Sequence, residues 1–273
     1  MGAGWFDMGA GWFDMGAGWV DRGGGGAPIF PTRADRPLAD FKIPPNPAAT
    51  FGKDSKRWDP DLFALSILPE FFSIKDATDR IWKDRIDIPA PAPLDSQAML
   101  DELQQVIILG VTERPQSLSE IIQQDQNMQL CWLQLLMITR HSHPATYLIM
   151  KLAARVGEAV MVYYKLQLSR ARPSQVCATL YPPLPVPGHS SYPAGHSLIG
   201  YLTSYCLRQV VKDAGVKDAL LELAKRVSDN RVIAGLHFPS DMDAGKKGAD
   251  GVFVIMQDCP TYQNALGYAQ QEW

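Results

Sequence analysis

Apolar side chains recur at helical spacing through most of this chain, and almost no stretch alternates polar with apolar residues as a half-buried strand does. The longest such run is "HPATYLIMKLAARVGEAVMVYYKLQLSRARP" (143–173), which we expect to be one helix ending at Pro173 because proline cannot continue a helix. Similar runs occupy 59–72, 93–111, 117–140, 197–215 and 216–236. With 273 residues the chain can bury a sizeable core, so the sequence predicts an all-α helical bundle.

The first 46 residues differ from the rest. Three consecutive units, "MGAGWFD", "MGAGWFD" and "MGAGWVD", are followed by "RGGGG" and a proline-rich stretch. Glycine at this density disfavours a helix, so we expect 1–46 to be a low-complexity flexible extension and 47–273 to be a single helical domain. The alternative is that the Trp and Phe residues of the repeats bind a partner.

Overall charge and apolar content exclude several classes of protein. A net charge of −3 provides no global positive field for nucleic acid or anionic membranes. We find neither a leader peptide nor about 18 continuous apolar residues, so we expect a soluble protein without membrane insertion. The expected location is the cytoplasm, or the periplasm or outside if the sequence is a processed form. Four widely spaced cysteines predict buried free thiols rather than zinc ligands or disulfides.

A long uncharged segment interrupts the helical pattern. Between Pro173 and Leu207 there is no Asp, Glu, Lys or Arg, and the first part of the segment contains six prolines. It is too broken to span a membrane and too apolar for a loose linker. We expect a structured loop that lines a pocket and leads into a helix.

Two basic residues precede this segment. In "KLQLSRARP", Lys165 and Arg172 are seven residues apart, which is about two helical turns, so both would point to one side of the helix. The alternative is a solvated basic face without a binding role.

Two histidines follow within the segment, each in a Gly-His-Ser tripeptide. In "YPAGHS" (192–197), Pro193 sets a turn, Gly195 allows close approach of the backbone, and His196 opens an apolar-periodic helix. Free N–H groups at a helix start bind anions. His189 lies between prolines and serines with no helix behind it. We therefore expect His196 to be the positioned histidine and His189 to be an ordinary loop or surface residue.

A third cluster lies near the end of the 216–236 run. In "RVIAGLHFPSD", Arg231 precedes His237 by six positions, and Asp241 follows His237 by four. Asp241 can hold the Nδ1–H group of His237 and so leave Nε2 free. Gly235 permits a tight turn before the histidine. As an isolated triplet, these residues would fit a helix-end salt bridge equally well.

Together the three clusters provide three cations, an anion-binding helix start and two histidines, one of them with a carboxylate partner. Phosphoryl transfer to a side chain requires this set: neutralised phosphate oxygens, a nucleophile and a separate acid for the leaving group.

The order K-x6-RP, P-x-GH and R-x5-H-x3-D, over residues 165–241, resembles the type 2 phosphatidic acid phosphatase and vanadium haloperoxidase superfamily. The stretches "SYPAGHSLIGY" and "NRVIAGLHFPSDMDAG" are most similar to soluble bacterial acid phosphatases. The resemblance implies the all-α bundle of that superfamily, with 47–273 as its catalytic domain.

Roles for individual residues follow from this resemblance alone. The phosphate oxygens would be held by three cationic side chains and one backbone N–H group, those of Lys165, Arg172, Arg231 and Gly195. His237 would be the nucleophile that forms a phosphohistidine, and Asp241 would orient it. His196 would protonate the departing alkoxide and then activate water. No metal or other cofactor is expected.

The chain departs from the family pattern at two positions. Ala194 occupies the phosphate-binding position where the family has serine, and one hydrogen bond to a charged group is worth about 1.5–3 kcal/mol. Ser191 or Ser197 could compensate for the missing hydroxyl. Asn230 replaces serine before Arg231, which is a milder change because asparagine also forms local hydrogen bonds.

Three functions remain open from the sequence. The first is a soluble, metal-independent phosphatase that acts on small phosphomonoesters and has no nucleic-acid partner. In the second, the groups that would hold phosphate instead hold vanadate on His237, and the protein is a haloperoxidase. Haloperoxidases of this superfamily are usually longer. The third is a phosphate-binding module with weak or no catalysis. Apolar helix faces make a homodimer plausible.

Overall fold

The computed structural model describes residues 58–273, so the repeats and the expected extension at 1–46 lie outside the described residues. Within this part the chain forms helices and no strand, which confirms the all-α prediction. The longer helices are α4 (Gln97–Thr112), α5 (Arg114–Asn127), α6 (Gln129–Leu136), α7 (Pro144–Leu168), α9 (Gly195–Arg208), α10 (Ala214–Ile233), α11 (Pro239–Met256) and α12 (Pro260–Ala269). The short ones are α1 (Pro60–Ala64), α2 (Ile67–Ser73), α3 (Trp82–Arg85), α8 (Pro173–Val176) and the 3₁₀ turns η2 (Ala178–Leu180) and η3 (Gln270–Glu272).

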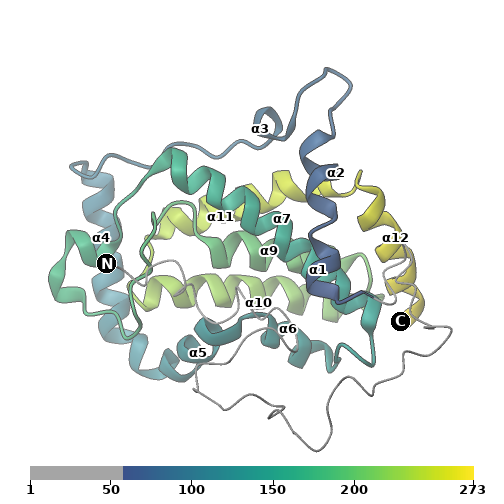
Figure 1. Cartoon of the computed structure of the whole chain (residues 1–273). Helices are drawn as coiled ribbons and strands as arrows, with labels where there is room; N and C mark the ends of the chain where they lie inside the picture. Colours follow the sequence, from purple (N-terminus) through teal and green to yellow (C-terminus); the bar gives the residue numbers. More distant parts are fainter. Residues whose placement is uncertain (1–57) are drawn as a thin grey trace, which may run out of the picture.

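Helix α9 runs through the middle of the bundle and packs against α7, α10 and α11 (Figure 1). Fully buried aliphatic residues face each other across these contacts: Ile149, Leu152, Val156 and Val160 on α7, Leu198 and Leu202 on α9, and Val252 and Ile255 on α11. Their spacing of three and four residues puts them on one face of each helix. Full burial of one such side chain contributes about 1.5–3 kcal/mol, so this interface fixes the position of the α9 start.

The end of α7 corrects one sequence expectation. The helix stops at Leu168 rather than running to Pro173, and Ser169 adopts a positive φ of 29°. The chain leaves the helix because the Arg170 backbone pairs with the loop before α9: its N–H group donates to Ser190 Oγ (2.9 Å), and its carbonyl accepts from the Ser191 N–H group (2.9 Å). Lys165 is therefore in the last turn of α7, whereas Arg172 lies beyond the helix.

The uncharged segment forms α8, η2 and a loop that leads into α9, as expected for a structured connection. No helix among residues 58–273 has both the length and the apolar character needed to cross a bilayer. All four cysteines are free thiols. Cys206 and Cys259 are buried as expected, whereas Cys131 and Cys177 are only half-buried.

Candidate active site

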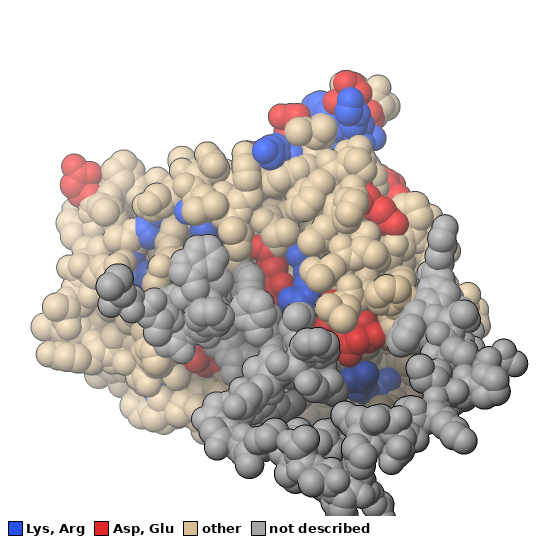
Figure 2. Space-filling model, in the orientation of Figure 1, with Lys and Arg blue, Asp and Glu red and all other residues tan. Residues whose placement is uncertain are grey.

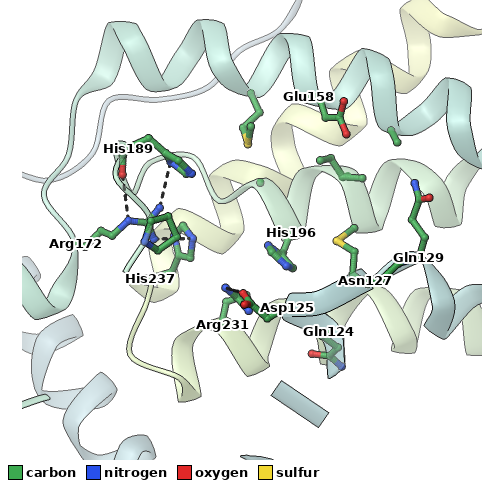
Figure 3. Close-up of a pocket in the computed structure, with 16 residues that line it drawn as sticks. Gln124, Asp125, Asn127, Gln129, Glu158, Arg172, His189, His196, Arg231 and His237 are labelled. Atoms are coloured by element: carbon green, nitrogen blue, oxygen red, sulfur yellow. Dashed lines mark hydrogen bonds and ion pairs between the residues drawn. The ribbon is translucent and has the colours of Figure 1, made fainter. Parts of the chain in front are cut away.

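One pocket collects most of the predicted site residues. It lies among the α5–α6 junction, one face of α7, the loop before α9, the start of α9 and the chain between α10 and α11. Five predicted residues line it: Arg172, Gly195, His196, Arg231 and His237 (Figure 3). Figure 2 shows acidic and basic side chains next to one another near the centre of the face in view, and a second mixed group at its upper tip. Lys165, Ala194 and Asp241 do not line the pocket.

His237 is held from behind by Asp241. The His237 Nδ1 atom is 3.1 Å from Asp241 Oδ2, which also accepts hydrogen bonds from the Phe238 N–H group (2.9 Å) and Ser191 Oγ. Both residues are buried. A carboxylate can only accept, so Nδ1 carries the proton and Nε2 keeps its lone pair. Gly235, at φ 78°, provides the turn expected before the histidine.

Arg172 lies beside the free nitrogen of that histidine. Its Nη1 atom is 3.3 Å from His237 Nε2 and donates to the Leu236 carbonyl at 2.9 Å. The other side of the guanidinium contacts His189, through Nε to its carbonyl oxygen (3.1 Å) and Nη2 to its Nδ1 atom (3.2 Å) (Figure 3). Arg172 therefore connects two histidines of the pocket.

This geometry corrects the expectation for His189. The residue lies in a loop, as expected, but it lines the pocket and is half-buried. Burial, with Lys165 and Arg172 nearby, lowers its pKa to about 4. The sequence signal for this position is the uncharged segment that contains His189, because that segment is expected to line a pocket. Residue type and the absence of a following helix gave the wrong indication.

Arg231 offers unpaired hydrogen-bond donors. Its Nη2 atom donates to Asp125 Oδ1 at 2.9 Å, while Nε and Nη1 are buried without a partner among the described residues. A buried, unsatisfied polar group costs about 1–3 kcal/mol, and more when it is charged. Because Arg231 lines the pocket, an anion bound there would supply the missing acceptors.

At the start of α9, Gly195 lies against the Met161 side chain. A Cβ atom at Gly195 would collide with Met161 Sδ, so this flexible side chain would have to move to admit a larger residue. Ala194 is fully buried, packs with Val232, Phe238 and Met242, and donates its N–H group to the Asp241 carbonyl (2.9 Å). The residue at the family's serine position thus packs in an apolar cluster.

Neither serine that was expected to compensate for Ala194 has a free hydroxyl. Ser191 Oγ donates to Asp241, and Ser197 Oγ donates to the Met242 carbonyl at 2.7 Å. Both side chains are fully buried. The missing hydroxyl donor is not replaced by either residue.

The two proposed reactive histidines share one electrostatic property. Burial, followed by Arg231 and His237, lowers the pKa of His196 well below its ordinary value. A hydrogen bond from the His196 ring to the Gln124 backbone partly opposes this shift in pKa. Burial, followed by Arg172 and Lys165, likewise lowers the pKa of His237. Both shifts favour the neutral form of the imidazole.

Lys165 acts on the loop rather than on the pocket surface. Its buried Nζ atom donates to the backbone carbonyls of Ser190 (2.6 Å) and Ser191 (3.0 Å). Burial and the charge of Arg172 lower its pKa, while Asp241 opposes the shift. Lys165 thus fixes the loop that carries His189 and Ser191, and it adds positive charge behind them.

Sequence reasoning missed three charged residues. Arg170 pairs with Asp241 (Nη1 to Oδ1, 2.8 Å) and with Glu102 on α4 (Nη2 to Oε2, 2.8 Å). Asp125 pairs with Arg231. Arg170 is within the stretch "SRARP", in which the family pattern specifies only Arg172 and Pro173. No local sequence pattern indicates Glu102 or Asp125, because Glu102 is 68 residues from Arg170 and Asp125 is 106 residues from Arg231.

Comparison with known proteins supports the family resemblance. No family model matches the chain. A non-specific acid phosphatase of Providencia stuartii is 31% identical over 85 residues, which cover 31% of this chain and 34% of that protein. Its Salmonella typhimurium counterpart is 36% identical over 87 residues, which cover 31% of this chain and 33% of that protein. The chain therefore spans about a third of the length of these curated relatives.

Among solved structures, a transmembrane PAP2-type phosphatidylglycerolphosphate phosphatase from Bacillus subtilis aligns with a TM-score of 0.35 and 17% identity, over 72% of this chain and 92% of that one. The acid phosphatase relatives support the type 2 phosphatidic acid phosphatase superfamily, as the three motifs indicate.

Proposed function

We propose that this chain hydrolyses small phosphomonoesters through a phosphohistidine on His237. Its similarity to acid phosphatases supports its assignment to the type 2 phosphatidic acid phosphatase superfamily. The observation that carries the proposal is the pairing of His237 Nδ1 with Asp241, which leaves Nε2 on the pocket side beside Arg172. The two unpaired donors of Arg231, in the same pocket, support binding of an oxyanion there.

In the first step, His237 Nε2 attacks phosphorus, the N–P bond forms and the bond to the ester oxygen breaks. The His196 imidazolium gives its proton to the departing alkoxide. In the second step, neutral His196 takes a proton from water, whose oxygen attacks phosphorus and breaks the N–P bond. Inorganic phosphate leaves, and both histidines return to their starting forms.

Arg172 and Arg231 would neutralise the phosphate oxygens, with the Gly195 N–H group as a further donor. These cations, together with buried Lys165 behind the loop, supply the charge that a metal ion supplies in other phosphatases. We therefore propose a metal-independent reaction.

His196 must be protonated when the alkoxide leaves, although burial and Arg231 lower its pKa. The substrate resolves this conflict. A phosphomonoester has its second pKa near 6, so below that pH it enters as a monoanion that carries a proton. Once bound, its negative charge opposes the arginines and raises the pKa of the nearby imidazole. This argument predicts an acidic optimum for turnover.

The test is hydrolysis of p-nitrophenyl phosphate in the presence of a chelator, followed by alkaline quenching and mass spectrometry of the peptide that contains His237. The proposal predicts turnover, inhibition by vanadate and a phosphate adduct on His237. Bromination that requires vanadate, bromide and peroxide, without ester hydrolysis, would favour the haloperoxidase alternative. Phosphate binding without either activity would favour the binding module.

A further inference from the structure

The pocket continues well past the cationic residues, along one face of α7. Ala154, Glu158 and Met161 line it at intervals of four and three residues, and Lys165 continues the same stripe four residues later. At about 1.5 Å per residue, Glu158 is roughly 10 Å from Lys165 along the helix axis. Figure 3 accordingly shows Glu158 and Gln129 on the side of the pocket away from Arg172 and His237.

The Glu158 carboxylate is held in place through one of its two oxygen atoms. Its Oε2 atom accepts from Arg155 Nη1 at 2.9 Å, whereas Oε1 has no partner among residues 58–273. Its side chain is only 14% exposed, and burial raises its pKa, with Arg155 acting in the opposite direction. Arg155 also pairs with Asp61 on α1 (3.3 Å), which fixes the guanidinium.

Apolar side chains make up part of the pocket lining: Met161 on α7, Ile199 on α9 and Met128 at the α5–α6 junction. The polar side chains of Gln124, Asp125 and Asn127 also line the pocket. An alkyl or ring portion of a substrate fits against the apolar side chains. Beyond them, Gln129 and Glu158 provide hydrogen-bonding groups.

We propose that Glu158 selects phosphomonoesters whose leaving group carries a hydrogen-bond donor, a hydroxyl or an ammonium, at its far end. This inference rests on the proposed function, because it needs the phosphoryl group to occupy the cationic end. Of the roughly 10 Å, a hydrogen bond to the carboxylate takes about 3 Å, and a chain advances about 1.2 Å per bond, so about four to six atoms would connect the ester oxygen to a donor at Glu158. A donor on a shorter chain would not reach the carboxylate.

The experiment compares three series of esters with the full chain: n-alkyl, ω-hydroxyalkyl and ω-aminoalkyl phosphates of two, four and six carbons. The measured quantity is kcat/KM for each donor-bearing ester divided by kcat/KM for the alkyl ester of equal length. A hydrogen bond to a carboxylate predicts a ratio of about 10 to 100 at four to six carbons and a ratio near one at two carbons.

Glu158→Gln should reduce the ratio for amines at least tenfold and the ratio for alcohols less, because the amide keeps a carbonyl acceptor but loses the charge. Glu158→Asp should shift the preferred chain length upward. Glu222→Gln, the same change on an exposed glutamate of α10, is the matched control and should leave the ratios unchanged. For the wild type, the amine ratio should rise with pH as Glu158 ionises.

Ratios near one at every length in the wild type would overturn this inference, and hydrolysis of p-nitrophenyl phosphate in the same preparation would show that the proposed function stands. An equal loss for all three series in Glu158→Gln would assign Glu158 a purely structural role and also overturn it. If p-nitrophenyl phosphate is not hydrolysed at all, the proposed function and this inference both fail.

Discussion

Arg170 and Asp241 form a fully buried ion pair, with 2.8 Å between Nη1 and Oδ1 and side chains that are 1% and 0% exposed. The second carboxylate oxygen of Asp241 faces His237. Arg170 also stacks over the Phe238 ring, with its guanidinium carbon 4.1 Å from the ring centre. A residue at an unspecified position of the first motif, between Lys165 and Arg172, thus fixes the carboxylate that orients the proposed nucleophile.

Arg170→Ala should therefore damage both folding and turnover. Removing one partner of a buried ion pair costs about 3–5 kcal/mol, and the stranded Asp241 charge would rotate toward other donors. We expect a lower midpoint of denaturant unfolding. Arg170→Lys tests positioning separately: it keeps the charge but cannot contact both Glu102 and Asp241 as the guanidinium does. At matched stability it should lower kcat more than it raises KM, and equal kcat would argue against a positioning role.

Substitution of the two histidines that contact Arg172 should have unequal effects. His237→Ala removes the proposed nucleophile and should abolish turnover of p-nitrophenyl phosphate. His189→Ala should keep most of kcat but raise KM severalfold, because Arg172 loses its contact with the imidazole. Steady-state kinetics of both purified variants provide the check. Equal loss of kcat in the two variants would contradict our assignment of the nucleophile.

Ala194→Ser restores the family residue but should not tighten phosphate binding. The side chain at this position is fully buried against Phe238, Met242 and Val232, so the hydroxyl would enter an apolar cluster. Burying an unpaired hydroxyl costs about 1–3 kcal/mol in proteins, which we expect as lost unfolding free energy. Calorimetric titration with inorganic phosphate and urea unfolding measure the two effects. A tenfold gain in phosphate affinity would show that the hydroxyl reaches the pocket.

The stability of the protein should fall as the solution is acidified below pH 6.5. Burial and nearby cations lower the pKa values of His189, His196 and His237 in the folded state. The unfolded chain, with histidine pKa near 6.5, then binds more protons, so the unfolding free energy decreases by about 1.4 kcal/mol per pH unit for each such histidine. The stabilising contribution is fully present above that pH.

Thermal unfolding between pH 5 and 8 measures this dependence. Replacing one histidine by glutamine should reduce the slope of the unfolding free energy against pH by the contribution of about one proton. Saturating inorganic phosphate should reduce this slope further, because the anion offsets the positive field of the nearby cations. A wild-type curve without slope below pH 6.5 would contradict the lowered pKa values.

Arg231 should account for part of the stabilisation that phosphate provides. In the wild type, the anion would satisfy the buried Nε and Nη1 donors, so inorganic phosphate should raise the midpoint of thermal unfolding. Arg231→Gln should lose most of this increase. Arg226→Gln, the same change at an exposed arginine of α10, is the control and should keep it. A wild-type midpoint that does not respond to phosphate would contradict an anion site at Arg231.

Local sequence determined the features that depend on neighbouring residues. Helical periodicity predicted the all-α fold, and the i to i+4 spacing predicted the contact between His237 and Asp241. The glycine before His237 predicted a turn that the positive φ of Gly235 provides. These features follow from backbone geometry over a few residues, so no distant partner is needed to infer them.

Tertiary structure alone decided what surrounds those features. The end of α7 at Leu168 depends on hydrogen bonds between Arg170 and the loop at 190–191, which compete with continuation of the helix. The position of His189 beside Arg172 and the pairing of Arg231 with Asp125 depend on packing between segments far apart in sequence. Helical propensity and spacing act over a few residues, whereas these contacts form only once the helices have buried their apolar faces together.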